Sequence, residues 1–438
     1  MLIATSSKCA PLPNTAADDK PLKPVVATRT HPRATSHGTY LRGILHDLED
    51  LEDYDESGYH PVYIGDTLGT SSRYRVIHKL GHGGFGTVWL CRDQQSPGYV
   101  AVKVMTADMT SDDCPELVLI SKLDRSLPGA EYIVNPLDFF SVVGPNGTHL
   151  CVVLPVLGPC VSPWLWRDLG QDPGHILRGM AYQAALAMSC LHKQGICHGD
   201  FRPSNILVKL NLAALNQLTE PELLSRLGEP RKSYVCTESG EDIPAFQPRY
   251  LTVPADIADL GSEYLTDQIC VIDFGESYPV ASPPPELGIP QQYQPPELLL
   301  ELEHPVGLAS DLWALACTLF EIRQQTPLFH MIDKKDDLIA YIFRCFGKPP
   351  QLLWDKWDAR QKYFDDQGRW IRHSSKWSLK VALSRDSQCL GAEPKQMVTP
   401  EEEQALMADL LYKLCRYEPE RRLSAEDVLG DQWFKFKI

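Results

Sequence analysis

Residues 198–205 read HGDFRPSN, and this stretch carries the strongest information about the fold. Asp200 stands five positions before Asn205, so a proton acceptor and a metal ligand can lie in one loop. Arg202 stands between them and can offset the charge of a phosphate group. Taken alone, such a stretch is more often a loop whose polar side chains cap the backbone. Its interpretation therefore depends on the segments around it.

A second polar segment follows at residues 271–275, which read VIDFG. Asp273 lies where a predicted strand ends, before an aromatic residue and a flexible glycine. A carboxylate there can bind Mg²⁺, a hard ion that prefers oxygen ligands and shares them with phosphate. The simpler alternative is an ordinary end of a core strand.

Upstream, residues 81–88 read GHGGFGTV between strands that we predict over residues 74–80 and 87–92. Phosphate oxygens can approach backbone N–H groups closely where glycine leaves no side chain in the way. Glycines also mark many hairpins, so this segment by itself is weak evidence. A Rossmann fingerprint should open a helix, whereas a strand follows here.

Lys103 ends the segment VAVK, within a strand that we predict over residues 99–105. An ammonium group is costly to bury in so apolar a strand unless it meets an anion. A triphosphate would supply one, together with Glu116 on a helix predicted over residues 113–123. The alternative is an edge-strand lysine that faces water.

The order of these segments matches the protein-kinase motifs, and the chain resembles the eukaryotic protein kinases over residues 74–434. Residues 295–297 (PPE) stand for the Ala-Pro-Glu motif, and Arg422 would pair with Glu297. Asp311 lies in a helix predicted over residues 308–322, which is apolar nearly all round.

The resemblance implies an α+β, bilobal fold. A small, five-stranded antiparallel sheet with one main helix would form the N-lobe, above a larger, mostly helical C-lobe, with ATP between them. We expect a flexible tail at residues 1–57, an N-lobe at 58–157 and a C-lobe at 158–438. Residues 209–267 would form an insertion in the C-lobe, beginning with a polar, helix-like piece at residues 211–227.

A closer resemblance is to the SR-protein kinases. Residues 58–66 (GYHPVYIGD), 88–90 (VWL) and 156–158 (VLG) resemble that family, and 68 positions separate Asn205 from Asp273, enough for its spacer. The chain is similar to a compact, fungal-type branch. The family phosphorylates serines in Arg-Ser-rich splicing factors, which implies a basic protein substrate, a role in mRNA splicing regulation, and a location in cytoplasm and nucleus. We also expect a monomer that binds neither nucleic acid directly nor a membrane.

The resemblance also implies the roles of individual residues. Lys103, oriented by Glu116, would hold the α- and β-phosphates of ATP, and Asp200 would accept the proton of the substrate hydroxyl. Arg202 replaces the usual catalytic-loop lysine, and Asn205 and Asp273 would bind Mg²⁺. His198 and Phe274 would belong to a packed spine. The nucleotide would lie against Leu80, Gly81, His82, Gly83, Gly84, Phe85, Gly86, Thr87, Val88, Ala101, Lys103, the gatekeeper Leu154 and the backbone of Leu157.

Two departures concern regulation and specificity. Gly199 stands where kinases usually have an arginine that binds a phosphate on the activation loop, and only 24 positions separate Asp273 from Glu297. A short, proline-rich loop suits a kinase that is active without loop phosphorylation. Gln294 replaces an arginine that, in related kinases, shapes the pocket for the residue after the phosphorylation site.

Composition fits these expectations. The 438 residues include 42 Lys and Arg and 57 Asp and Glu, which gives a net charge of −15. This balance argues against binding to nucleic-acid backbones and favours cationic partners. Residues 47–56 hold seven acidic residues, which we expect to be a solvated run, with docking of a basic partner as the alternative. Thirteen cysteines without a Cys-x-x-Cys pair indicate neither disulfides nor a zinc site.

Two other functions stay open. The HGD segment with its following asparagine also resembles aminoglycoside and choline phosphotransferases, which usually lack the glycine-rich loop found here. A pseudokinase would use the same fold only as a scaffold. The chain retains every residue that phosphate transfer requires, which argues against a pseudokinase. These residues are Lys103, Glu116, Asp200, Asn205 and Asp273.

Overall fold

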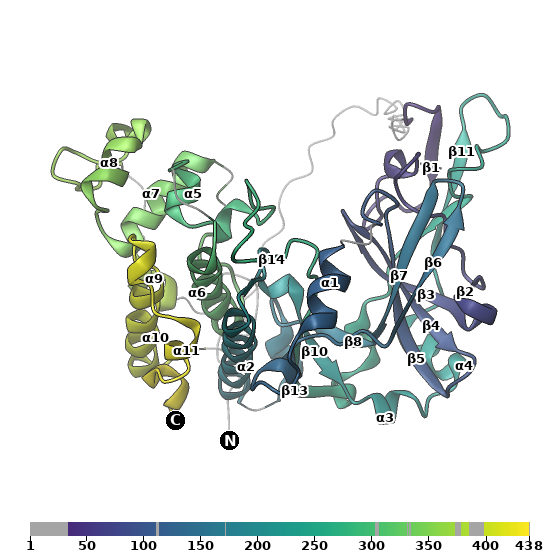
Figure 1. Cartoon of the computed structure of the whole chain (residues 1–438), viewed down its shortest axis with the longest axis horizontal. Helices are drawn as coiled ribbons and strands as arrows, with labels where there is room; N and C mark the ends of the chain where they lie inside the picture. Colours follow the sequence, from purple (N-terminus) through teal and green to yellow (C-terminus); the bar gives the residue numbers. More distant parts are fainter. Residues whose placement is uncertain are drawn as a thin grey trace, which may run out of the picture.

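The chain folds into two lobes, as the resemblance implied (Figure 1). The computed structural model describes residues 34–110, 114–170, 172–302, 306–330, 332, 334–372, 378–384 and 398–437. Its helices are α1 Pro115–Lys122, α2 Pro173–Lys193, α3 Leu212–Leu215, α4 Glu220–Leu227, α5 Pro296–Leu299, α6 Leu308–Gln324, α7 Lys335–Phe346, α8 Gln351–Lys356, α9 Leu379–Leu383, α10 Glu401–Leu414 and α11 Ala425–Val428.

The N-lobe is a six-stranded antiparallel sheet in the order β2-β3-β4-β5-β7-β6. Its strands are β2 Thr67–Leu68, β3 Tyr74–Gly83, β4 Gly86–Asp93, β5 Gly98–Met105, β6 Asp138–Gly144 and β7 Gly147–Pro155. The five strands predicted from the sequence are present, and the two-residue β2 adds a sixth at the edge. Every residue of the central β5 is buried, which explains why its sequence is apolar on both faces.

A second, three-stranded sheet joins two segments that are far apart in the sequence. It has the order β1-β11-β12, with β1 at Thr39–Arg42, β11 at Lys232–Thr237 and β12 at Tyr250–Thr252. Leu51, Tyr54, Tyr59, Val235 and Leu251 form a hydrophobic cluster beside it. Residues 34–57 are therefore folded rather than part of a flexible tail, because they bury apolar side chains against the insertion. Residues 1–33 lie outside the described residues.

The predicted insertion also packs against the N-lobe sheet. The helix-like piece over residues 211–227 is two helices, α3 and α4, each started by a local cap: Asn211 accepts from the Ala214 N–H, and Thr219 and Glu222 form a capping box. Their apolar faces contact the lower part of the sheet (Figure 1), where Tyr99 donates a hydrogen bond to the Leu218 carbonyl at 2.8 Å. The insertion thus helps hold the N-lobe in place.

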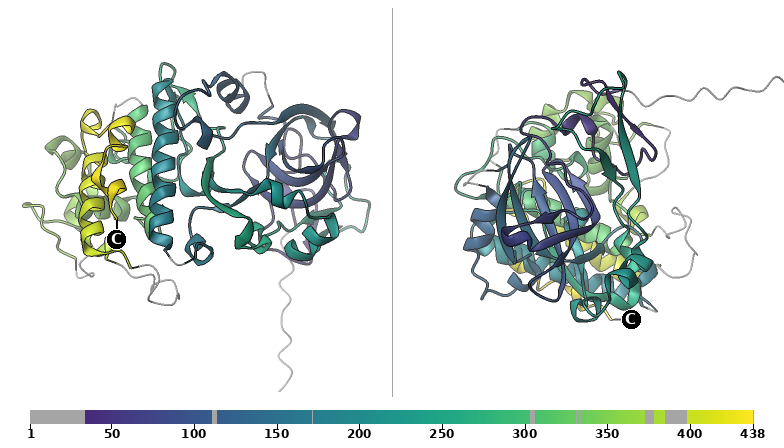
Figure 2. Two further views of the ribbon diagram at one scale, coloured as in Figure 1. Left: turned by 90° about the horizontal axis from the view of Figure 1, so that it is seen from below. Right: turned by 90° about the vertical axis from the view of Figure 1, so that its right-hand side faces the viewer.

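The C-lobe is built around long helices that lie side by side (Figure 2). α2 begins where the Asp172 side chain caps the His175 N–H, and its apolar face is buried. α6 is buried almost all round. Glu403 of α10 accepts hydrogen bonds at 2.8 Å from Arg178 of α2 and Arg323 of α6. Although burial alone would raise the pKa of Glu403, these two guanidinium groups lower it.

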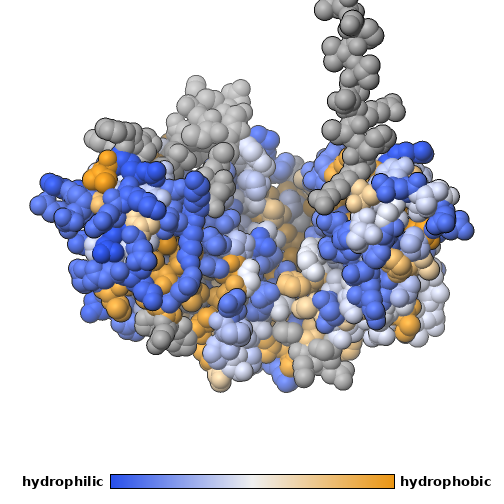
Figure 3. Space-filling model, turned by 90° about the horizontal axis from the view of Figure 1, so that it is seen from above, coloured by the Kyte–Doolittle hydropathy of each residue, from blue (hydrophilic) through white to orange (hydrophobic). Residues whose placement is uncertain are grey.

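A short stretch of chain between β7 and β8 (Leu157–Cys160) crosses from the N-lobe to the C-lobe. β7 ends at Pro155, and β8 begins a C-lobe sheet with β10 (Ile206–Leu210) and β13 (Leu265–Val271). Val156 between them is buried. A further strand pair joins β9 (Ile196–Cys197) to β14 (Tyr278–Pro279). The space-filling view shows a hollow between the lobes (Figure 3). In the described part of the chain no helix is long and apolar enough to cross a lipid bilayer.

Candidate active site

Lys103 is the centre of a buried charge cluster between the lobes. Its Nζ lies 2.6 Å from Oε2 of Glu116 on α1 and 3.0 Å from Oδ1 of Asp273. Burial alone would lower the pKa of Lys103, but the two carboxylates raise it above its ordinary value. The side chain is a permanent cation facing the junction of the lobes. The lysine therefore meets carboxylates and does not face water as an edge-strand residue would.

Asp273 follows β13 in a left-handed backbone conformation, with φ of 63°. Burial would raise its pKa, but Lys103 lowers it, so the group is an anion at neutral pH. The next residue, Phe274, is fully buried, and its ring centroid lies 4.8 Å from that of His198. This packing anchors the backbone next to Asp273, while Lys103 holds the Asp273 carboxylate itself.

The loop at residues 198–205 holds its polar side chains together through short hydrogen bonds. Both carboxylate oxygens of Asp200 lie 2.9 Å from Nε of Arg202, and Nδ2 of Asn205 donates to Oδ2 of Asp200 at 2.7 Å. Burial raises the pKa of Asp200, while Arg202 and Asn205 oppose the rise. Asp311 of α6 accepts from the N–H groups of His198 and Gly199, at 2.7 and 3.1 Å. The loop is therefore anchored to the core of the C-lobe.

Gly199 occupies a position that admits no side chain. Its φ is 80°, and a Cβ atom there would lie 2.2 Å from the carbonyl oxygen of Glu276. An arginine at this position would require the backbone to move. The departure noted in the sequence thus has a local steric cause.

The glycine-rich loop connects β3 to β4 and leaves its glycines open. Cβ atoms built on Gly81, Gly83 and Gly84 would meet nothing within 4 Å, whereas one on Gly86 would lie 2.4 Å from the Val104 carbonyl oxygen. At the loop tip, the Phe85 ring lies near Gly275, since a Cβ atom on that glycine would be 3.4 Å from Phe85 Cδ2. The loop tip therefore lies over the segment that carries Asp273.

Two features of this loop were missed from the sequence. The Tyr59 hydroxyl donates to the Gly83 carbonyl at 2.8 Å, and Lys79 of β3 forms a buried ion pair with Glu49. The Tyr54 hydroxyl also donates to Glu49, at 2.7 Å. The acidic run at residues 47–56 is therefore only partly solvated, because Glu49 compensates the charge of a buried lysine. The sequence did contain a signal for this ion pair, because Lys79, like Lys103, is an ionisable residue in an otherwise apolar strand and needs a partner of opposite charge.

The remaining predicted nucleotide residues lie on the strands around the hinge. In the sheet registers, Ala101 of β5 is opposite Leu154 of β7, and Val88 of β4 is opposite Lys103. Leu80, Leu154 and Leu157 are half-buried, while Ala101 is buried. His82, Thr87 and Val88 form the hairpin itself, where His82 pairs with Thr87. The predicted nucleotide-contacting residues therefore lie both on the N-lobe sheet and, at Leu157, on the first strand after the crossing to the C-lobe.

The donor chemistry of Asn205 and Asp273 fits Mg²⁺. An amide oxygen and a carboxylate are the hard oxygen ligands that this ion prefers, alongside phosphate oxygens. The two residues are linked through the backbone, because the Ile272 N–H donates to the Asn205 carbonyl at 2.9 Å. Among the described residues no group of three or more His, Cys, Asp and Glu side chains is arranged to hold a metal by itself. Phosphate oxygens would therefore have to complete such a site.

Hydrogen bonds that involve no phosphorylated residue hold the segment that follows Asp273. The Ser277 hydroxyl donates to the His198 carbonyl at 2.8 Å, and β14 pairs with β9. At its end, Glu297 accepts two hydrogen bonds of 2.7 Å from Arg422, which confirms the pairing expected from the sequence. Gln294 donates to the Ile289 carbonyl at 2.8 Å and so stabilises the turn before it.

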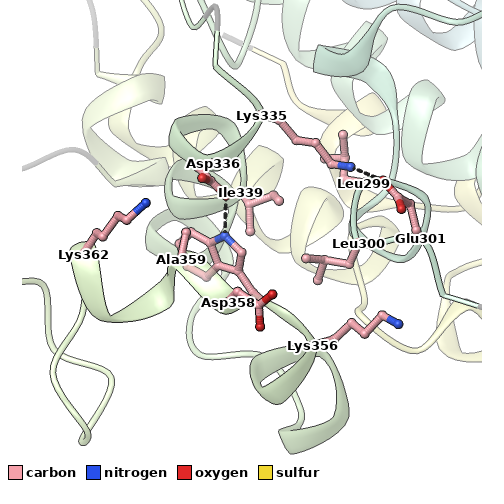
Figure 4. Close-up of a pocket in the computed structure, with 11 residues that line it drawn as sticks. Leu299, Leu300, Glu301, Lys335, Asp336, Ile339, Lys356, Asp358, Ala359 and Lys362 are labelled. Atoms are coloured by element: carbon pink, nitrogen blue, oxygen red, sulfur yellow. Dashed lines mark hydrogen bonds and ion pairs between the residues drawn. The ribbon is translucent and has the colours of Figure 1, made fainter.

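A pocket of about 510 Å³ lies away from this site, near α5 and α7 (Figure 4). Lys335 pairs with Glu301 at 2.6 Å, and the Trp357 indole N–H donates to Asp336 at 2.8 Å. Its lining charges balance, with three lysines and three carboxylates. Although it is the larger of the two pockets described here, none of the residues discussed above line it, so we place the chemistry at the junction of the lobes.

The chain is similar to known proteins over most of its length. A model of the protein kinase domain matches residues 74–218 and 262–434. The serine/threonine-protein kinase SRPK of Physarum polycephalum is 28% identical over 425 residues, covering 88% of this chain and 92% of that protein. Protein kinase dsk1 of Schizosaccharomyces pombe is 25% identical over 483 residues, covering 88% and 85%. Human SRSF protein kinase 3 is 37% identical over 196 residues, covering 42% and 34%.

Proposed function

Because the chain belongs to the protein kinase family, we propose that it transfers the γ-phosphoryl group of ATP to serine or threonine residues of basic, Arg-Ser-rich proteins such as splicing factors. It is a serine/threonine protein kinase of the SRPK type, and protein kinases generally use ATP and Mg²⁺. The observation that carries the proposal is the convergence of Lys103, Glu116 and Asp273 from three separate elements, beside the loop that holds Asp200.

Each group then has a defined task. Lys103, held by Glu116, binds the α- and β-phosphates, and the backbone N–H groups of the glycine-rich loop bind phosphate oxygens. Asp200 accepts the proton of the substrate hydroxyl. At the same time the hydroxyl oxygen forms a bond to the γ-phosphorus, and the bond between that phosphorus and the leaving oxygen of ADP breaks. Arg202 offsets negative charge beside Asp200. Magnesium, held by Asn205 and Asp273, would neutralise charge on the phosphates when bound. The rate comes from positioning and charge compensation.

Two lines of support favour a basic substrate. The relatives include a kinase named for SRSF proteins, and the chain carries a net charge of −15, which attracts cationic partners. We further propose that the protein is a monomer that acts in the cytoplasm and nucleus and does not bind nucleic acid directly.

The test is phosphate transfer from radiolabelled ATP to an Arg-Ser-rich peptide, with choline and aminoglycosides as competing acceptors. We expect label only on the peptide. Transfer to the small alcohols would instead support the phosphotransferase alternative. Lack of any transfer, with ATP still bound, would support a pseudokinase scaffold.

We further propose that the kinase is active without phosphorylation of its activation segment. The ion pair of Lys103 with Glu116 forms in the unmodified chain, and Gly199 provides no side chain to bind a phosphate. Treatment of the purified kinase with a broad-specificity phosphatase, followed by removal of the phosphatase, should change kcat by less than about twofold. Mass spectrometry verifies dephosphorylation, and a kinase that depends on loop phosphorylation serves as control. A large loss of activity would refute this mode of activation.

A further inference from the structure

A second pocket, of about 280 Å³, opens beside the tip of the glycine-rich loop. Four carboxylate residues line it, together with Gly84 of the loop and Thr106 just after β5: Asp53, Asp55, Glu56 and Asp108. We call it the acidic pocket. It lies outside the pocket of Figure 4, and the proposed mechanism gives its four carboxylates no role.

The charges of the acidic pocket are not compensated within the described part of the chain. Its four carboxylate side chains form no ion pair with another described residue. Burial and the neighbouring carboxylates Asp50, Asp55 and Glu52 raise the pKa of Asp53. A cation would relieve this repulsion.

A buried hydroxyl in the pocket wall supplies an independent indication of a ligand. Thr106 is 6% exposed, and its Oγ1 has no hydrogen-bond partner among the described residues. A buried hydroxyl without a partner is unfavourable, so such a group is usually paired in the functional state. Thr106 is one of the residues that line the pocket, and its Oγ1 has free lone pairs that can accept a hydrogen bond.

The pocket is preformed by backbone contacts between its two walls. The Ala107 N–H donates to the Gly58 carbonyl at 3.1 Å, and the Asp108 N–H donates to the Ser57 carbonyl at 2.9 Å. The Thr106 N–H donates to the Phe85 carbonyl at 3.1 Å, which ties the same wall to the glycine-rich loop. Less conformational entropy is therefore lost on binding.

We propose that the acidic pocket binds the guanidinium group of an arginine in the protein substrate, at a position away from the phosphorylated residue. A guanidinium carries five N–H donors in a planar fork, so it can donate to carboxylates and to the Thr106 hydroxyl together. Gly84 belongs to the loop predicted to cover the phosphates, so the pocket borders the place where the substrate meets ATP. The inference rests on the proposed function, because it takes the substrate to be basic.

The first test is a double variant, Asp55→Asn with Asp108→Asn. Two peptides carry the same acceptor serine, one flanked by arginines and one by uncharged residues. We expect the ratio of kcat/KM values, basic over uncharged peptide, to fall about three- to tenfold. The matched control is Glu401→Gln with Glu402→Gln, which removes two carboxylates from the first turn of α10 in the other lobe. An unchanged ratio in the pocket variant, or an equal fall in the control, would overturn the proposal.

The second test measures binding alone, with a fluorescent arginine-rich peptide and fluorescence polarisation in the absence of ATP. We expect the pocket variant to raise Kd about three- to tenfold and the control to leave it nearly unchanged. The binding assay does not depend on phosphate transfer. If the wild-type protein phosphorylated neither peptide of the first test, the proposed function would be wrong, but the binding assay would still test whether the acidic pocket binds arginine. Unaltered peptide binding in the variant, with loss of Ca²⁺ or Mg²⁺ binding instead, would identify a metal site and overturn the proposal.

A third variant, Thr106→Val, separates a ligand contact from a structural role. The substitution keeps the shape of the side chain and removes a buried hydroxyl without a partner, so Tm should rise or stay the same. If the hydroxyl accepts a bond from arginine, peptide affinity should nevertheless fall about two- to fivefold. If a stable Thr106→Val protein binds the peptide as tightly as the wild-type protein does, the hydroxyl does not contact the substrate arginine, which contradicts this part of the proposal.

Discussion

Replacing Asp200 with asparagine should lower kcat about 10²- to 10⁴-fold, the usual contribution of a positioned general base. Asparagine has nearly the same shape but cannot take the proton of the substrate hydroxyl. It can still accept a hydrogen bond from Nδ2 of Asn205 or Nε of Arg202, which now hold the carboxylate at 2.7 and 2.9 Å. The loop should therefore keep its conformation while the chemical step slows.

The measurement is single-turnover phosphorylation of a basic peptide, with ATP affinity and Tm determined in parallel. The matched control is Asp259→Asn, an exposed aspartate of the insertion whose side chain forms no hydrogen bond or ion pair among the described residues. We expect ATP affinity and Tm to change little in both variants. Full activity of the Asp200→Asn protein would show that another group accepts the proton.

Replacing Lys103 with methionine should both inactivate and destabilise the kinase. Activity should fall at least about 10²-fold, because the charge that holds the phosphates is lost. Stability should fall by about 3 kcal/mol or more, since Glu116, which is 2% exposed, would remain buried without its cation. The loss of stability arises mainly from the unpaired carboxylate and not from the missing lysine.

The double variant Lys103→Met with Glu116→Gln tests that explanation. It should recover most of the lost stability measured by urea unfolding, because the deeply buried carboxylate of Glu116 is replaced by a neutral amide and only the more exposed Asp273 still lacks its cation, yet stay inactive. A double variant as unstable as the single one would contradict the explanation. Recovery of activity would contradict the role of Lys103 in binding phosphate.

The pH dependence of stability provides a further check on the same variant. Lys103 holds the pKa of Asp273 below its ordinary value, so this ion pair adds stability that is present above about pH 4. That stability is lost as the pH falls through the lowered pKa. The difference in stability between the wild-type protein and Lys103→Met should therefore narrow on acidification.

The local elements and the order of the chemical segments could be predicted from the sequence. Glycines, an apolar strand that contains Lys103, and alternating or helical patterns of apolar residues are all short-range signals. They were sufficient for the strands of the N-lobe and for the helix predicted over residues 308–322, whereas the Glu297–Arg422 pair was predicted from the resemblance to the protein kinases. Phosphate chemistry requires specific residue types at set spacings, so motif order also predicted the family.

What could not be predicted depends on contacts between distant segments. The Ile64 N–H donates to the hydroxyl of Tyr250, 186 positions away, and β1 pairs with β11 over a similar separation. Neither segment carries a local pattern that specifies its partner, so residues 34–57 were predicted to be a flexible tail. For the same reason Glu49 was predicted to be solvated, although it neutralises Lys79.

The sequence by itself thus determined which chemical groups are present, in what order, and on which kinds of local element. Only the tertiary structure decided which of them meet: that Lys103 pairs with both Glu116 and Asp273, that Tyr59 holds the glycine-rich loop, and that four exposed carboxylates gather beside Thr106. The physical reason is that strand and helix patterns act over a few residues, whereas burial of charge and closure of a pocket depend on packing across the whole fold.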